Sequence, residues 1–187
     1  MKALIGYFCS AAALLLACAA PQQGGKVESS KPAPASGMVL TSTVFKEGEL
    51  IPAKYSGYGE NASPDLAWTG APEATVCFVL ICRDPDAPGG TFYHWVMFNI
   101  PDTVSHLPEG LGRSPMLRFG GGQGMNSFRR VGYDGPRPPM GTHRYYFDLY
   151  ALNMNWMLDE TTTANQLLER MQGHIITQAS LMGKYTK

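Results

Sequence analysis

Two long apolar stretches constrain the fold more than any other feature of the sequence. "TVCFVLICRD" (residues 75–84) and "TFYHWVMFNI" (91–100) are apolar at odd and even positions alike. Successive side chains of a strand point to opposite sides of a sheet, so both stretches are predicted to be strands covered on both faces. A third stretch, "HRYYFDLYALN" (143–153), alternates and predicts a strand with one buried face. With 21 Gly and 14 Pro among 187 residues, the chain is predicted to be mainly β.

The C-terminal segment, residues 161–187, is the one part that favours helices. A threonine run offers an N-cap, and Gly173 predicts the end of a first helix. Apolar residues at helical spacing support that helix and a second one after the glycine: Leu167, Leu168 and Met171, then Ile175, Ile176 and Leu181. We therefore expect two short helices packed on or beside the sheet.

The N-terminus has the pattern of an export signal. Lys2 precedes a continuous apolar run from Ala3 to Ala17, which is too short to span a bilayer comfortably. The run ends at "LLAC", which resembles a bacterial lipoprotein signal and predicts lipidation of Cys18; the alternative is ordinary cleavage one or two residues later. We expect residues 1–18 to be the signal with its lipidated cysteine, 19–37 to be a flexible tether rich in Pro, Ser, Gly and Ala, and 38–187 to be the folded domain.

Charge and cysteine usage narrow the function classes. The 15 basic and 15 acidic residues balance, which argues against nucleic acid as a partner, since phosphate backbones need a basic face. Cys77 and Cys82 stand five residues apart in one predicted strand, so they point to opposite faces and are expected to be buried free thiols. There is no cysteine pattern for a metal and no disulfide framework.

Polar residues gather at the predicted strand ends. Asp84 and Asp86 follow a buried strand in the stiff segment "DPDAP", and His94 interrupts the next one. The Pro-rich loop "GPRPPMGTHRY" leads into His143, with Tyr145 on the same face. If these strands are neighbours, two carboxylates, two imidazoles and a phenol converge at one end of the sheet.

Three chemistries could use this set of side chains. The imidazoles and the phenol can donate hydrogen bonds to an anion, and nearby carboxylates would favour protonated histidines. Two His and two Asp could instead bind a divalent metal, and an Asp–His pair could act as general acid and base on a phosphoester. These residues alone do not decide between the three chemistries. They also have a purely structural interpretation, in which the aspartates form a solvated turn and the histidine belongs to the core.

The motifs taken together resemble a known family. "SPDLAW", "DPDAP", "YHWVMFNI", "GYDGPRPPMGTHRYYFDLYAL" and "GHIITQASLMGKY", in this order and spacing, are similar to the phosphatidylethanolamine-binding proteins, above all their bacterial Raf-kinase-inhibitor-like branch. The resemblance spans about residues 38–185. It implies a large antiparallel sheet, a smaller second sheet, C-terminal helices and a small anion pocket at one end. By resemblance the pocket residues are Asp84, Asp86, Ala87, His94, Pro138, Pro139, His143 and Tyr145.

Two departures from the family pattern stand out. "YSGYGEN" (55–61) replaces a loop that often contains Cys-Asp-Gly in bacterial members, and Arg129 stands where a glycine is usual. An extra arginine near an anion pocket would strengthen phosphate binding, or it would simply be solvated.

The expected function is that of a membrane-tethered, non-enzymatic binding protein in the bacterial cell envelope, outside the cytoplasm. Its ligand would be phosphate, a phosphorylated small molecule or a phospholipid headgroup, with no cofactor and no metal. The alternatives are a weak phosphoester hydrolase using Asp84, Asp86 and His143, and a protein-interaction or protease-inhibitor module. The kinase-regulating role of eukaryotic relatives does not carry over, because nothing in the sequence specifies a kinase partner.

Overall fold

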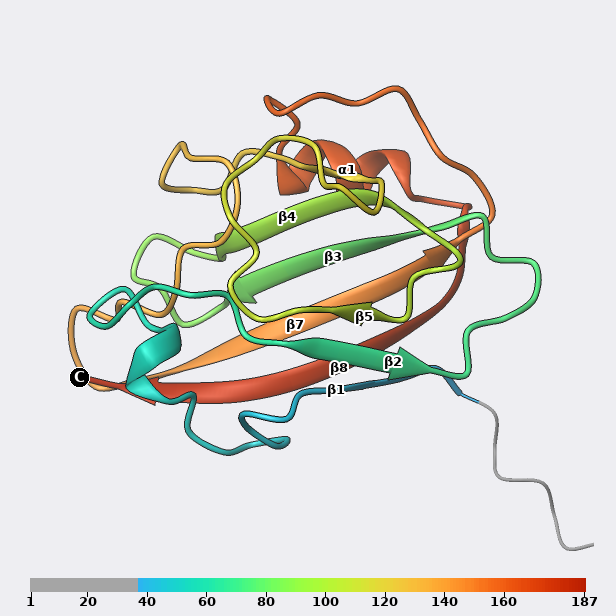
Figure 1. The fold of residues 1–187 in the computed structure, drawn as a ribbon. Helices are drawn as coiled ribbons and strands as arrows, with labels where there is room; N and C mark the ends of the chain where they lie inside the picture. Colours follow the sequence, from blue (N-terminus) through green and yellow to red (C-terminus); the bar gives the residue numbers. More distant parts are fainter. Residues whose placement is uncertain (1–36) are drawn as a thin grey trace, which may run out of the picture. The chain divides into compact units, whose positions relative to one another are not determined.

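Two antiparallel sheets dominate the computed structural model, which describes residues 37–187 (Figure 1). The five-stranded sheet has the order β6 (Gly122–Gln123), β4 (Phe92–Pro101), β3 (Cys77–Asp84), β7 (Thr142–Leu152), β8 (Ile175–Thr186). The three-stranded sheet has the order β1 (Val39–Thr41), β2 (Leu66–Thr69), β5 (His106–Leu107). The predicted mainly β fold with a large and a smaller sheet is confirmed. The expected signal and nearly all of the expected tether lie outside the described residues.

The large sheet is the middle of three layers. One of its faces packs on the small sheet, through a core that joins Trp68 and Leu107 to Phe78 and Phe147. Its other face packs on helix α1 (Ala164–Arg170), through a second core that includes Val79 and Leu167 from these two elements. Because β3 and β4 lie between the two cores, their side chains are buried on both faces, as the apolar pattern predicts.

Only the first of the two predicted helices forms. Thr163 caps α1 in a capping box with Gln166, and the helix buries Leu167 against the sheet. The segment after Gly173, expected to be a second helix, is strand β8, which pairs with β7 along its length. Its buried residues alternate (Ala179, then Leu181), and its β-branched start suits a strand, so sheet pairing outweighs the helical spacing. None of the helices within residues 37–187 is long and apolar enough to cross a membrane.

The two thiols of the domain lie in different cores. Cys82 faces the core between the two sheets, and Cys77 faces the core beneath α1. Both are unbridged, as their spacing predicts. Burial raises the pKa of Cys77 to about 11 and that of Cys82 well above its ordinary value, so neither thiol is a nucleophile at neutral pH.

Candidate binding site

Three strand ends meet at one end of the large sheet. Strand β3 is antiparallel to both of its neighbours, so its last residues lie beside the first residues of β4 and β7. Asp84 pairs with Phe92 in β4, and the preceding Arg83 pairs with Tyr146 in β7. The sequence expectation that these strands are neighbours is therefore confirmed.

A cavity of about 180 Å³ opens at this end of the sheet. It is smaller than the roughly 300–1,000 Å³ of sites for drug-sized ligands, which restricts it to a small ligand or headgroup. Six of the eight residues expected from the sequence line it: Asp84, Ala87, His94, Pro138, Pro139 and His143. The other lining residues are Pro88, Phe92, Phe128 and Arg137. Of the expected set, Asp86 and Tyr145 do not line the cavity.

Asp84 and His143 form a buried pair in the cavity wall. The His143 Nδ1 lies 2.7 Å from the Asp84 Oδ2, and both side chains are almost fully buried. The other carboxylate oxygen, Oδ1, accepts a hydrogen bond from the backbone N–H of Asp86 at 2.8 Å. This second bond closes the turn of "DPDAP" and holds the carboxylate at the end of the strand. The pair therefore fixes the orientation of the His143 ring toward the cavity.

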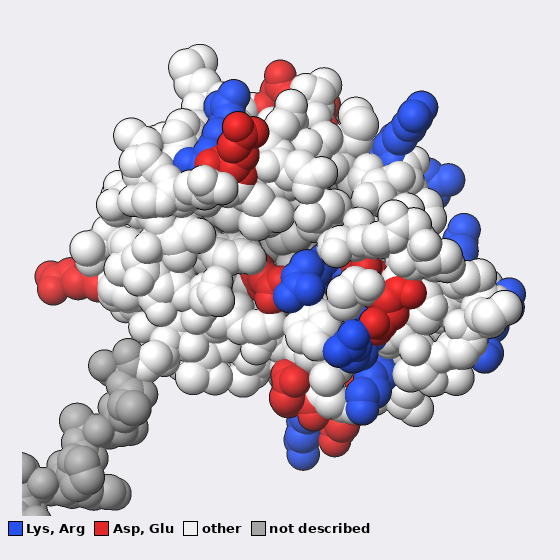
Figure 2. All heavy atoms as spheres, turned by 180° about the vertical axis from the view of Figure 1, so that it is seen from behind, with Lys and Arg blue, Asp and Glu red and all other residues white. Residues whose placement is uncertain are grey.

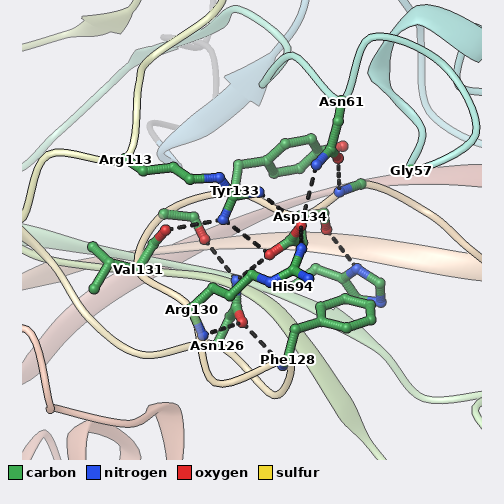
Figure 3. Close-up of polar contacts among 12 residues, drawn as sticks. Gly57, Asn61, His94, Arg113, Asn126, Phe128, Arg130, Val131, Tyr133 and Asp134 are labelled. Carbon is green, nitrogen blue, oxygen red and sulfur yellow. Dashed lines mark hydrogen bonds and ion pairs between the residues drawn. The ribbon is translucent and has the colours of Figure 1, made fainter.

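His94 is held from behind by the backbone of Asp134 (Figure 3). The His94 Nδ1 lies 2.6 Å from the Asp134 carbonyl oxygen, and the Asp134 N–H donates back to the His94 carbonyl at 3.0 Å. Burial lowers the pKa of His94, although the Asp134 carbonyl opposes the shift. The expectation that nearby carboxylates keep this histidine protonated is therefore wrong for His94, because loss of hydration outweighs their charge.

Asp134 is the centre of a buried network that sequence reasoning missed (Figure 3). Its carboxylate accepts two bonds from the Arg113 guanidinium, at 2.7 and 3.0 Å, and one each from Asn126 at 2.9 Å and Asn61 at 3.1 Å. Burial opposes ionisation of Asp134, but these bonds outweigh it and lower its pKa. The partners come from separate loops, so only the fold reveals the network. Asp134 thus joins three loops behind His94.

Asp86 faces away from the cavity despite standing two residues after Asp84. Its carboxylate binds the Arg144 guanidinium through both oxygens, at 2.6 and 2.9 Å, and also accepts the Arg144 N–H. These hydrogen bonds from Arg144 lower the pKa of Asp86 to about 2. Asp86 is therefore ionised and already neutralised, and it ties the turn after β3 to the start of β7.

Tyr145, whose ring lies next to His94, carries an unpartnered hydroxyl. Tyr145 is fully buried, and its ring meets the His94 ring edge-on at 5.2 Å. Its hydroxyl has no hydrogen-bond partner among the described residues. Burial and the charge of Asp84 raise the pKa of Tyr145, so the phenol keeps its proton. Phe128 packs edge-on against His94 at 5.6 Å and gives the cavity an apolar wall.

Arg137 supplies the cation at the cavity rim, and it was missed although it stands within the Pro-rich motif. Its guanidinium donates to the Gly57 carbonyl at 2.6 Å and lies 6.0 Å from the centre of the Tyr58 ring. The Tyr58 hydroxyl donates to the Pro138 carbonyl at 2.9 Å. A Cβ on Gly57 would lie 2.7 Å from the Arg137 Nε, so only glycine leaves room for this approach. The loop that departs from the family pattern thus holds the rim.

Arg129 does not line the cavity, and its backbone explains the usual glycine. It is exposed and has a φ of 59°, in the left-handed region where side chains other than glycine are strained. Arg129 therefore contributes strain to the loop rather than charge to the cavity.

Charges elsewhere are mixed in sign. On the face shown in Figure 2, several basic and acidic side chains lie next to each other, and basic side chains with no acidic neighbour in view follow its right edge. Across residues 37–187, no group of three His, Cys, Asp or Glu side chains is placed to hold a metal ion.

Comparison with known proteins places these features in a family. The family model described as phosphatidylethanolamine-binding protein matches residues 41–186. A protein of Methanothermobacter thermautotrophicus, named only UPF0098 protein, is 41% identical over 80% of this chain and 99% of its own length. A crystal structure of a phosphatidylethanolamine-binding protein homologue from Chlamydia trachomatis has a TM-score of 0.75 and 41% identity, covering 82% of this chain and 99% of that one. The crystal structure of YbcL of E. coli has a TM-score of 0.76 and 33% identity, covering 80% of this chain and 98% of that one.

Proposed function

Because this chain belongs to the phosphatidylethanolamine-binding protein family, we propose that it is a binding protein whose cavity takes a small anion. The ligand is phosphate, a phosphorylated small molecule or a phospholipid headgroup. The side chains that contact it are those of Asp84, His94 and His143 in the wall and Arg137 at the rim, together with Pro138 and Pro139.

The observation that carries this proposal is the state of Arg137. Two other arginines near this end of the sheet are paired with carboxylates: Arg113 binds Asp134, and Arg144 binds Asp86. Among the described residues, Arg137 has no carboxylate partner, and it lines the cavity. An uncompensated guanidinium beside a small cavity attracts an anion and can bind phosphate through two hydrogen bonds.

Calorimetric titration with phosphoethanolamine tests the proposal. Arg137→Gln removes the rim charge and keeps a hydrogen-bonding side chain, so we expect the affinity to fall by roughly tenfold to a hundredfold. Arg129→Gln is the matched control, because Arg129 is exposed and lies outside the cavity lining, and we expect its affinity to equal that of the wild type. Absence of binding to the wild type, or equal affinity for the wild type and Arg137→Gln, would refute the proposal.

We also propose that a lipid on Cys18 tethers the protein to a membrane of the bacterial cell envelope. The support is the apolar run that ends at "LLAC" and the Pro-, Ser- and Gly-rich segment after it. Cys18→Ala removes the thiol that would carry the lipid, so the variant should stall in processing or leave the membrane fraction. A processed Cys18→Ala protein that still fractionates with membranes would contradict the tether.

The Asp84–His143 pair favours one further candidate, a weak phosphoester hydrolase. A carboxylate at 2.7 Å orients an imidazole for proton transfer, as in general acid–base catalysis. If this activity exists, the purified protein should turn over a generic phosphoester and His143→Ala should abolish the turnover. Binding without turnover leaves the non-enzymatic function as the better supported one.

A further inference from the structure

We propose that the cavity selects anions that carry a hydrogen-bond donor of their own, such as hydrogen phosphate or phosphoethanolamine, over anions that carry none, such as sulfate. This inference rests on the proposed anion-binding function and adds the chemical class of the ligand. It follows from counting which lining side chains can donate a hydrogen bond and which can only accept one.

The tautomer of His94 is set by its partner. A carbonyl oxygen can only accept, so the His94 Nδ1, at 2.6 Å from the Asp134 oxygen, carries the proton. In a neutral imidazole the other nitrogen, Nε2, then presents a lone pair. Burial lowers the pKa of His94 and keeps the ring neutral. His94 therefore offers the cavity an acceptor.

The Asp84–His143 pair follows the same logic. An ionised carboxylate only accepts, so the proton of the 2.7 Å contact lies on the His143 Nδ1. Of the roughly four acceptor positions on a carboxylate, one is used by His143 and another by the Asp86 N–H. Asp84 lines the cavity, so it brings negative charge and remaining lone pairs to the site.

Donors are few by comparison. Arg137 is the one lining side chain that donates in every protonation state, and His143 adds its Nε2–H only when that ring is protonated. The cavity therefore combines a cation at the rim with acceptors in the wall. An anion with no hydrogen would gain from Arg137 but face the Asp84 charge with no proton between them. A P–OH group or an ammonium group would donate to the same acceptors.

Three anions of similar size separate these cases. Hydrogen phosphate carries a hydroxyl, fluorophosphate replaces that hydroxyl with fluorine, and sulfate carries no hydrogen at neutral pH. We would titrate each into the full chain, purified in a detergent without phosphate groups, at pH 7.5 and constant ionic strength. We expect phosphate to bind at least about tenfold more tightly than fluorophosphate or sulfate, because a buried acceptor left unpaired costs about that much.

The three results separate the two proposals. If phosphate and sulfate bind with equal affinity, the donor requirement is overturned while anion binding stands. If no anion binds, the proposed function fails and the donor requirement fails with it. Tight binding of fluorophosphate, which matches the shape and charge of hydrogen phosphate, would also overturn the requirement.

Paired variants then identify the acceptor. Asp84→Asn removes the charge and supplies an amide donor, so it should raise the affinity for sulfate and bring the phosphate-to-sulfate ratio to within about threefold. Asp86→Asn is the matched control, because that carboxylate faces Arg144 and not the cavity, and it should leave the ratio unchanged. An unchanged ratio in Asp84→Asn would remove Asp84 from this role. If Asp84→Asn does not fold, the comparison of the three anions on the wild type still decides.

Discussion

Asp84 and Asp134 are both buried carboxylates next to a histidine of the site, but they differ in how fully they are hydrogen-bonded. Asp134 accepts bonds from two asparagines, from Arg113 and, at 3.5 Å, from Arg130, and all these partners are protein groups. Asp84 accepts one imidazole and one backbone N–H, and it lines a cavity. A saturated carboxylate has nothing left for a ligand, so Asp134 holds loops together. Asp84 keeps acceptor capacity at the surface where a ligand would lie.

The largest expected effect is on the stability of the protein when Asp134, the fully hydrogen-bonded carboxylate, is removed. Asp134→Ala leaves a buried donor of Asn126 and a half-buried donor of Asn61 unpaired and frees Arg113, so the free energy of unfolding should fall by about 3 kcal/mol. Asp86→Ala, which breaks a more exposed pair with Arg144, should cost at most about 1 kcal/mol. Denaturant titration followed by circular dichroism measures both. Equal losses in the two variants would contradict the idea that Asp134 is the structural centre.

The second prediction concerns the Asp84–His143 pair in the cavity wall, where we expect an effect on ligand binding. His143→Ala removes a ligand contact and the partner of Asp84, so the affinity for phosphoethanolamine should fall by roughly one to two decades. His106→Ala is the control, because His106 is exposed on β5 in the smaller sheet. Calorimetry on both variants at one pH is sufficient. A His143→Ala protein that binds like the wild type would show that the unsaturated pair does not contact the ligand.

His94 lies between the two carboxylates and should make stability depend on pH. Its pKa is lowered in the folded protein, so the unfolded chain binds more protons and the free energy of unfolding rises with pH. The contribution is complete above the unfolded value of about 6.5 and is lost as the pH falls below it, by at most about 1.4 kcal/mol per pH unit. Urea titrations at several pH values between about 7.5 and 5 should show this slope, and His94→Gln should flatten it. An identical slope in the variant would assign the effect to another group.

The smallest effect concerns the loop that Asp134 holds. Arg129→Gly relieves a left-handed backbone at an exposed position, so it should stabilise the protein by up to about 1 kcal/mol. Arg130→Gly is the neighbouring control; it has no such strain to relieve and loses a contact of 3.5 Å with Asp134, so it should not stabilise. Thermal unfolding of both variants makes the test. A destabilised Arg129→Gly protein would show that the side chain, and not the backbone, matters there.

The parts of the fold that could be predicted are those set by local pattern. Apolar residues at both odd and even positions located β3 and β4. In β7, His143 and Tyr145 lie on the buried face that the alternating pattern predicts. The segment after Gly173 was predicted incorrectly because its apolar spacing suits a helix, whereas pairing with β7 decides its structure. Asp86 shares a motif with Asp84, but the turn between them sends its carboxylate to Arg144.

The roles of Asp134 and Arg137 depend on contacts that no local pattern reveals. The partners of Asp134 lie as far as 73 residues away along the chain, so its role appears only once the loops meet. Arg137 could have been singled out as the cation inside "GPRPP", but its orientation depends on Gly57 and Tyr58, 80 and 79 positions earlier. The motifs therefore named most of the side chains that line the cavity but not the arginine at its rim.

The two free, buried thiols of Cys77 and Cys82 can be used to measure local opening of the domain. Cys82 lies in the core between the two sheets, whereas Cys77 lies in the other core, where its Sγ donates to the Met154 carbonyl, so a different part of the domain must open before a thiol reagent reaches each sulfur. The modification rate of each site then measures how often that part of the domain opens under native conditions. Mass spectrometry of the two labelled peptides would give separate opening free energies for the two cores, without any engineered probe.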